Sequence, residues 1–440
     1  MLSKLASQEL SQKILTQARA LGASAAEVTV SSHEGFTVEV RHGAVETVEQ
    51  NCGHGLTLGV YFGQCFGVAS TSDFRLDALN LVVEKAGYIA RHTEADACFG
   101  LAEAQLMAHS YSDLDLDHPW DLTTEAAIEL GKLCEARGLA CDQRIINSDG
   151  ASVSTTRNLV VYGNTHGFIG LVPSTVHSLA CSLIAEQNQK MQRDYDFTVA
   201  RDVKMLVEAP RVGENAAQRT LARLGARTLT ARKTPVIFTA LLARELIGEF
   251  IDAISGRNLY NRTSFLVDSL GKPVFPEHLT ITELPHLMQA LGSSPFDAEG
   301  VATRDRDLVQ RGVLMGYVLS SYSARKLKMT TTANAGGIHN VVVHSPHRYS
   351  MAELLKLMGT GLVITELLGH GVNLTTGDYS RGAFGFLVEN GIIQYPVEGL
   401  TIAGNLRDMF LGIRAIADDL DTRGVIRTGA LLVEQMTVAG

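Results

Sequence analysis

Apolar and polar residues alternate along this chain with two different periods, which divide it into helical and extended segments. Residues 4–21, 73–91, 123–138 and 201–226 place apolar side chains three and four positions apart, which predicts amphipathic helices. Runs such as EVTVS, FTVEV and GLTLGVYF alternate at every second residue and predict strands. Residues 143–199 alternate in the same way and predict an antiparallel meander.

The second half of the chain is richer in glycine, and its strand-like runs are shorter. Helices are predicted there at 241–254, 350–358 and 405–420. The run FGFLVENGIIQYPV, residues 384–397, predicts a hairpin, because the Asn-Gly pair at its centre favours the positive φ angles of a type I′ turn.

Together these patterns predict an α+β fold with largely antiparallel sheets. Residues 1–228 are expected to form an N-terminal domain that mixes helices with a strand meander. Residues 229–440 are expected to form a glycine-rich C-terminal domain dominated by β-structure. The predicted boundary lies near 226–234, where ARTLTARKTP joins the two parts, and a chain of 440 residues is long enough for two cores.

Composition and charge exclude several classes of protein. The 45% hydrophobic and 19% charged residues are typical of a globular protein, and the net charge of −9 disfavours binding to nucleic acid. We expect no membrane segment and no signal peptide, because no apolar run is long enough and the amino terminus is polar and helical. The six cysteines form no Cys-x-x-Cys pair, which predicts reduced thiols and a cytoplasmic protein.

The predicted helix 241–254 carries the most suggestive charged residues. Glu245 and Glu249 are four positions apart and therefore share one helix face, with Arg244 beside them. A zinc-protease helix has two histidines at such spacing and a glutamate that activates the metal-bound water. The residues alone favour an ordinary helix whose polar face carries two glutamates offset by an arginine.

Three further stretches resemble the TldD/PmbA family, and more narrowly its PmbA (TldE) branch. They are residues 299–329, which read EGVATRDRDLVQRGVLMGYVLSSYSARKLKM, residues 333–340, which read ANAGGIHN, and residues 358–409, which begin MGTGLVITELLGHGVNLTTGDYSRGAF. Weaker similarity, including GLTLGVYFGQCFGVASTSD, extends the resemblance over nearly the whole chain.

The resemblance implies what the helix 241–254 has lost. In the TldD branch the motif is His-Glu-x-x-x-His, completed by a downstream cysteine, and the protein is a zinc peptidase. Here Arg244 stands at the first histidine, Glu245 at the glutamate and Glu249 at the second histidine, and no cysteine follows Cys181. We therefore expect no metal and no other cofactor on this chain, with the catalytic zinc on a TldD-type partner.

Two other groups of residues are candidates for a peptide cleft. His339 lies in the family-like GGIHN, whereas alternation along a strand would direct His344 to the opposite face, which argues against a shared metal site. The segment Thr376–Gly382 contains the second group. Arg381 could bind a peptide carboxylate or carbonyl, and Asp378 a peptide amine, or the two could close a glycine-flanked turn. The complete set of cleft candidates is Arg244, Glu249, His339, Asp378, Tyr379, Ser380 and Arg381.

Three functional hypotheses follow. The first is a subunit without zinc ligands that binds extended peptides and assembles with a TldD-type protease, or with itself, for proteolysis of small or unfolded peptides. The second is a metal-independent or differently liganded peptidase, acting as a homodimer, with Glu245 as general base. The third is a non-enzymatic regulator that binds a folded client protein, as the family's older description as a modulator of gyrase suggests.

Overall fold

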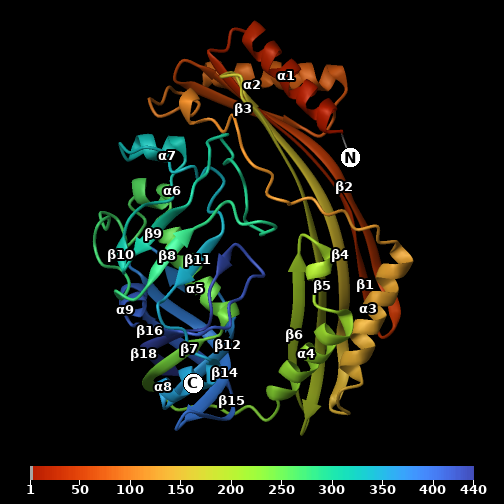
Figure 1. Ribbon diagram of the computed structural model, residues 1–440, viewed down its shortest axis with the longest axis vertical. Helices are drawn as coiled ribbons and strands as arrows, with labels where there is room; N and C mark the ends of the chain where they lie inside the picture. Colours follow the sequence, from red (N-terminus) through yellow and green to blue (C-terminus); the bar gives the residue numbers. More distant parts are fainter. Residues whose placement is uncertain (1–2) are drawn as a thin grey trace.

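A computed structural model describes residues 3–440, and Figure 1 shows one long curved sheet standing beside a second, more compact part. The long sheet has six strands in the order β3-β2-β1-β4-β5-β6, and every neighbouring pair is antiparallel. Its strands are β1 (Ala25–Arg41), β2 (Ala44–Phe62), β3 (Cys65–Thr71), β4 (Ile145–Asn164), β5 (Ile169–Gln187) and β6 (Lys190–Ala200). Several runs that alternate separately in the sequence are therefore joined into single strands.

Helices pack against the two ends of this sheet (Figure 1). They are α1 (Lys4–Ala20), α2 (Leu76–His92), α3 (Thr124–Leu139) and α4 (Ala209–Ala222). The first two cover a core that includes Val28 and Leu58, and the last two cover a core that includes Val38 and Leu183. The predicted helix 201–226 is shorter than expected, because Pro210 in the first turn of α4 fixes its start.

The compact part contains two sheets. The smaller has the order β10-β9-β8-β11-β17, and five strands of the larger close into a ring, because β12 pairs with both β7 and β14. The strands are β7 (Arg232–Phe238), β8 (Thr280–Glu283), β9 (Arg306–Gln310), β10 (Val313–Leu314), β11 (Val341–His344), β12 (Gly361–Leu368), β13 (Val372–Asn373), β14 (Asp378–Glu389), β15 (Ile392–Asn405), β16 (Ile413–Ile416), β17 (Ile426–Arg427) and β18 (Leu431–Ala439).

The helices of this part are short, apart from the first. They are α5 (Ala240–Ala253), α6 (Gly256–Tyr260), α7 (Ser321–Lys326), α8 (Met351–Met358) and α9 (Leu406–Leu411). Within residues 3–440, no helix combines the length and the apolar character that crossing a membrane requires.

The predicted α+β class with largely antiparallel sheets is confirmed, and so is the hairpin. Asn390 and Gly391 have φ angles of 53° and 74°, and they join β14 to β15. The predicted helix 405–420 is wrong. It ends at Leu411, and after Gly412 the residues Ile413–Ile416 pair with β18, since strand pairing with a buried neighbour overrides the local helical spacing.

The contact between α3 and α4 depends on glycine. A methyl group at Gly213 would lie 3.0 Å from the carbonyl carbon of Cys134 and 3.1 Å from the amide nitrogen of Gly138. At Gly248 of α5, by contrast, the nearest atom would be Ile426 Cδ1 at 3.9 Å.

We expect Gly213→Ala to destabilise the protein by about 2 kcal/mol, because backbone atoms of α3 cannot move aside cheaply. The control Gly248→Ala should be neutral or stabilising by up to about 1 kcal/mol, because alanine favours the helix. Urea unfolding followed by circular dichroism measures both. Equal effects of the two substitutions would contradict the close α3–α4 contact.

Candidate functional site

The helix α5 is set in place by the strand before it. β7 lies inside the larger sheet between β12 and β18, and Thr239 connects it directly to α5. The buried face of α5 includes Leu242, Leu246 and Phe250, which belong to the largest core of the protein. Apolar residues at this spacing fix the rotation of the helix, so its charged residues point to defined neighbours.

One charged side of α5 faces β14. The Arg381 guanidinium donates to Glu245 Oε2 at 2.7 Å and to the carbonyl of Gly369 at 3.0 Å. Tyr379 lies two residues earlier on the same strand and is buried, so its side chain and that of Arg381 share one face of β14. Burial and the charges of Glu245 and Glu249 raise the pKa of Tyr379, against the opposing effect of Arg381.

Glu249 lies one turn further along α5 and is half-buried. Its pKa is raised from the ordinary value, first by burial and then by the charges of Asp252 and Glu245, while Arg381 and His370 oppose the rise. The face shared by Glu245 and Glu249, predicted from their spacing, thus meets Tyr379 and Arg381 of the predicted cleft segment.

Arg244 points to a different neighbour. Its Nη1 lies 3.5 Å from Oδ1 of Asp421, a carboxylate whose side chain is only 3% exposed. Asp421 also accepts hydrogen bonds from Arg423, at 3.2 Å from Nε and 2.9 Å from Nη2. Burial favours a higher pKa for Asp421, but Arg423 and Arg244 hold it below its ordinary value.

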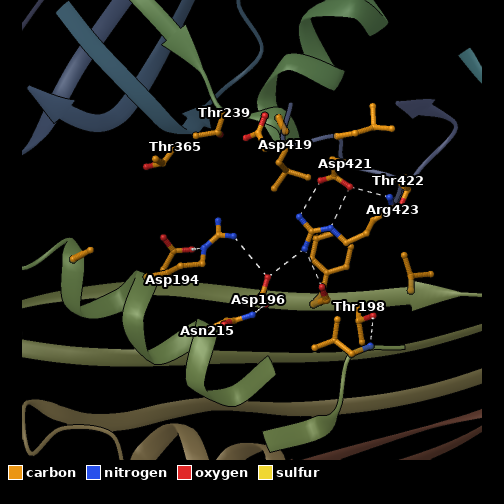
Figure 2. Close-up of a pocket in the computed structure, with 18 of the residues that line it drawn as sticks. Asp194, Asp196, Thr198, Asn215, Thr239, Thr365, Asp419, Asp421, Thr422 and Arg423 are labelled. Atoms are coloured by element: carbon orange, nitrogen blue, oxygen red, sulfur yellow. Dashed lines mark hydrogen bonds and ion pairs between the residues drawn. The ribbon is translucent and has the colours of Figure 1, made fainter. Parts of the chain in front are cut away.

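A pocket of about 680 Å³ lies beside these residues, between the long sheet and the compact part. Its walls come from β6, α4, the first turn of α5, and residues 419–423. In Figure 2, Arg423 lies between Asp421 and Asp196 of β6, and Thr239 and Thr365 lie with Asp421 on the side opposite β6. The side-chain oxygen of Thr365 is buried without a hydrogen-bond partner among residues 3–440.

The structure places the other cleft candidates elsewhere or in local turns. His339 is buried, and its backbone nitrogen and Nδ1 lie 2.8 and 3.2 Å from Oε1 of Glu283, a carboxylate that also binds Arg306. Asp378 accepts from the Thr376 hydroxyl at 2.7 Å, as a turn residue does. Ser380 donates its backbone N–H to the carbonyl of Gly371.

Sequence reasoning missed the acidic residues of the pocket. Asp194 and Asp196 alternate on β6, and Asp419 and Asp421 belong to the run DDLDTRG at 418–424. The signal was present as a cluster of carboxylates with one arginine, but nothing in the sequence places it against β6. Among residues 3–440, no three His, Cys, Asp or Glu side chains form a group that could hold a metal ion.

Comparisons with known proteins agree over the full length of the chain. Residues 26–90, 117–224 and 231–440 match domain 1, the central domain and the C-terminal domain of the PmbA/TldA metallopeptidases. Metalloprotease PmbA of Escherichia coli O157:H7 is 46% identical, over 94% of this chain and 92% of its own. The PmbA homologue of Haemophilus influenzae is 44% identical, over 100% of this chain and 98% of its own.

More distant relatives extend the comparison. A crystal structure from Bacteroides thetaiotaomicron, described as a proposed modulator of DNA gyrase, has a TM-score of 0.94 and 26% identity over 100% of both chains. The metalloprotease TldD homologue of Haemophilus influenzae is 26% identical, over 68% of this chain and 65% of its own. Relatives of both the PmbA and the TldD kind therefore exist.

The strand that leads into a charged helix beside an interdomain pocket, together with these matches, defines a protein of metallopeptidase-like architecture. The chain belongs to the PmbA/TldD family, in its PmbA branch.

The raised pKa of Glu249 predicts a dependence of stability on pH. The folded protein holds the proton of this carboxyl to a higher pH than the unfolded chain, so its contribution to stability falls as pH rises above the ordinary pKa of 4.5. Glu249→Gln removes that loss. The melting temperature of the variant, relative to that of the unmodified protein, should therefore rise as the pH increases from about 4 to 7.

Thermal unfolding across this pH range measures the difference, with Glu9→Gln on the exposed side of α1 as control. A difference between the Glu249→Gln and unmodified proteins that stays constant with pH would contradict the burial argument.

Proposed function

We propose that this chain is a subunit of a TldD/TldE-type peptide-processing metalloprotease, in which it binds substrate and completes the assembly while a TldD-type partner holds the zinc. The observation that carries the proposal is the engagement of Arg244 by Asp421 and of Glu245 by Arg381, in a chain that otherwise keeps the family fold. Location in the cytoplasm is part of the proposal.

The side chains of Arg244, Glu245 and Glu249 do not fit a zinc ion. Zinc in proteases is bound by neutral imidazole, carboxylate or thiolate groups in a tetrahedral arrangement. A guanidinium has no lone pair to offer, and the carboxylate of Glu245 is held at 2.7 Å by Arg381. Glu249 remains as one carboxylate, and a single carboxylate makes a poor zinc site.

A role in holding extended peptides is supported by the position of the pocket. β6 is the last strand of the long sheet, and its residues Asp196–Val199 form one wall. A strand at a sheet edge presents backbone N–H and C=O groups to which an extended peptide can add, with little dependence on the peptide sequence. The acidic and basic side chains around the pocket would then select among peptide ends.

The chain alone should bind no stoichiometric zinc and should leave an unstructured peptide uncleaved. Mixing it with a TldD-type subunit should yield a complex of defined mass that cleaves the same peptide. Elemental analysis, native mass spectrometry and a peptide-cleavage assay measure these outcomes. Tight zinc together with turnover by the isolated chain would refute the proposal.

The role of Glu245 separates the subunit hypothesis from a peptidase that uses Glu245 as base. In the reconstituted complex, Glu245→Gln should lower turnover by less than about tenfold, because it only weakens the contact with Arg381. Loss of a general base would lower turnover by about 10²–10⁴-fold. Substitution of the motif glutamate in the TldD-type subunit is the matched control, and a large effect in this chain instead would favour the second hypothesis.

A further inference from the structure

A row of four charged side chains runs from α5 to the long sheet. Arg244 contacts Asp421 at 3.5 Å, Asp421 binds Arg423 at 2.9 Å, and Arg423 Nη1 lies 3.2 Å from Oδ1 of Asp196 on β6. Arg423 also donates to the carbonyl of Phe197 at 3.0 Å, and its guanidinium lies 4.5 Å from the centre of the Phe197 ring. The row therefore connects the compact part to the edge strand that lines the pocket.

These charges are too well buried to be ordinary surface pairs. The side chains of Asp421 and Asp196 are 3% and 10% exposed, and those of Arg244 and Arg423 are 21% and 28% exposed. A buried charge whose partner is removed is strongly unfavourable, and Asp421, the most deeply buried member, relies on Arg244 and Arg423. Asp196 also lies 3.7 Å from Nη1 of Arg219. Asn215 of α4 completes the row by donating to the second oxygen of Asp196 at 2.9 Å.

The chain also provides space for the Arg244 guanidinium. A methyl group at Gly424 would lie 2.7 Å from Arg244 Cζ, so any larger residue at 424 would displace the guanidinium from Asp421. The φ angle of Gly424 is not positive, so the close approach of Arg244, and not the backbone conformation, explains why glycine stands there.

We infer that Arg244 is a positioning residue between the compact part and the long sheet. Acting through Asp421 and Arg423, it holds residues 418–424 against β6 and thereby fixes one wall of the pocket. This role concerns the isolated chain and does not depend on any activity toward peptides. It gives a positive function to the residue that stands where the resemblance places a metal-binding histidine.

Other contacts limit how far the effect should spread. Gln192 donates to Glu398 at 2.7 Å near the start of β6, and Arg201 donates to the carbonyls of Ala290 and Leu291 just beyond its end. Loss of the Arg244 contact should therefore loosen the middle of β6 and residues 418–424, while hydrogen exchange in residues 188–193 stays unchanged.

Hydrogen exchange measured by mass spectrometry on the full chain tests the inference. Arg244→Ala should speed exchange by roughly tenfold or more in peptides covering 194–200 and 418–424, and not in 188–193. Gly424→Ala retains every charged group and should produce the same pattern. Arg381→Ala, which breaks the other ion pair of α5, is the matched control and should leave 194–200 unchanged.

Chemical rescue distinguishes the loss of the Arg244 charge beside Asp421 from a general loss of packing. Guanidinium ion at millimolar concentration should restore protection to Arg244→Ala, because it fits the vacated site beside Asp421, whereas urea of similar shape and no charge should not. Unchanged exchange at 194–200 in both Arg244→Ala and Gly424→Ala would overturn the inference. So would a uniform rise over the whole chain in both variants, or rescue by urea as effective as by guanidinium.

Discussion

The carboxylate of Asp421 is almost completely removed from water, and its charge has to be balanced inside the protein. Two guanidinium groups do so, one from α5 and one two residues further along the same loop. Because the second of these also binds Asp196 and Phe197, the positions of the helix, the loop and the edge strand depend on one another. The shape of the pocket between the two parts of the chain depends in part on this balance.

The two ends of the Arg-Glu-x-x-x-Glu segment face different parts of the molecule. Adjacent residues on a helix point about 100° apart, so Arg244 reaches the loop at 421–424 whereas Glu245 reaches Arg381 on β14. One side of α5 therefore faces the loop at 421–424, and the side that carries Glu245 and Glu249 faces Tyr379 and Arg381 of β14. The two residues that stand where the resemblance places histidines, Arg244 and Glu249, therefore lie in different surroundings.

Local patterns predicted most of the elements but few of the connections between them. The period of two along residues 143–199 and the Asn390-Gly391 turn are properties of neighbouring residues, so the long strands and the hairpin were predictable. The same local reasoning produced the error at 405–420, because only the distant strand β18 decides that residues 413–416 are extended. Closure of the ring depends on the pairing of β12 with β7, more than 120 residues earlier in the chain, which no local pattern reveals.

The candidate site shows the same division. Helical spacing placed Glu245 and Glu249 together, but the residues around Arg381 were expected in a turn and instead lie on β14. The bond between Glu245 and Arg381 joins residues 136 positions apart. Asp196 and Arg423 are 227 positions apart, and each is an unremarkable charged residue in its own segment. Long-range ion pairs depend on the complete fold, so their members cannot be distinguished in one sequence from charges that face solvent.

Two guanidinium groups balance carboxylates on α5 and on the loop that faces it. A zinc ion would contribute two positive charges to this helix, and Arg244 and Arg381 together contribute the same number. The two positive charges lie in different places, because Arg244 contacts Asp421 and Arg381 contacts Glu245. Neither guanidinium contacts Glu249 directly. Burial and the nearby charges of Asp252 and Glu245 therefore disfavour the ionised form of Glu249, which raises its pKa. Arg244 and Glu245 thus each have a direct partner of opposite charge, whereas Glu249 lies near two carboxylates and has a raised pKa.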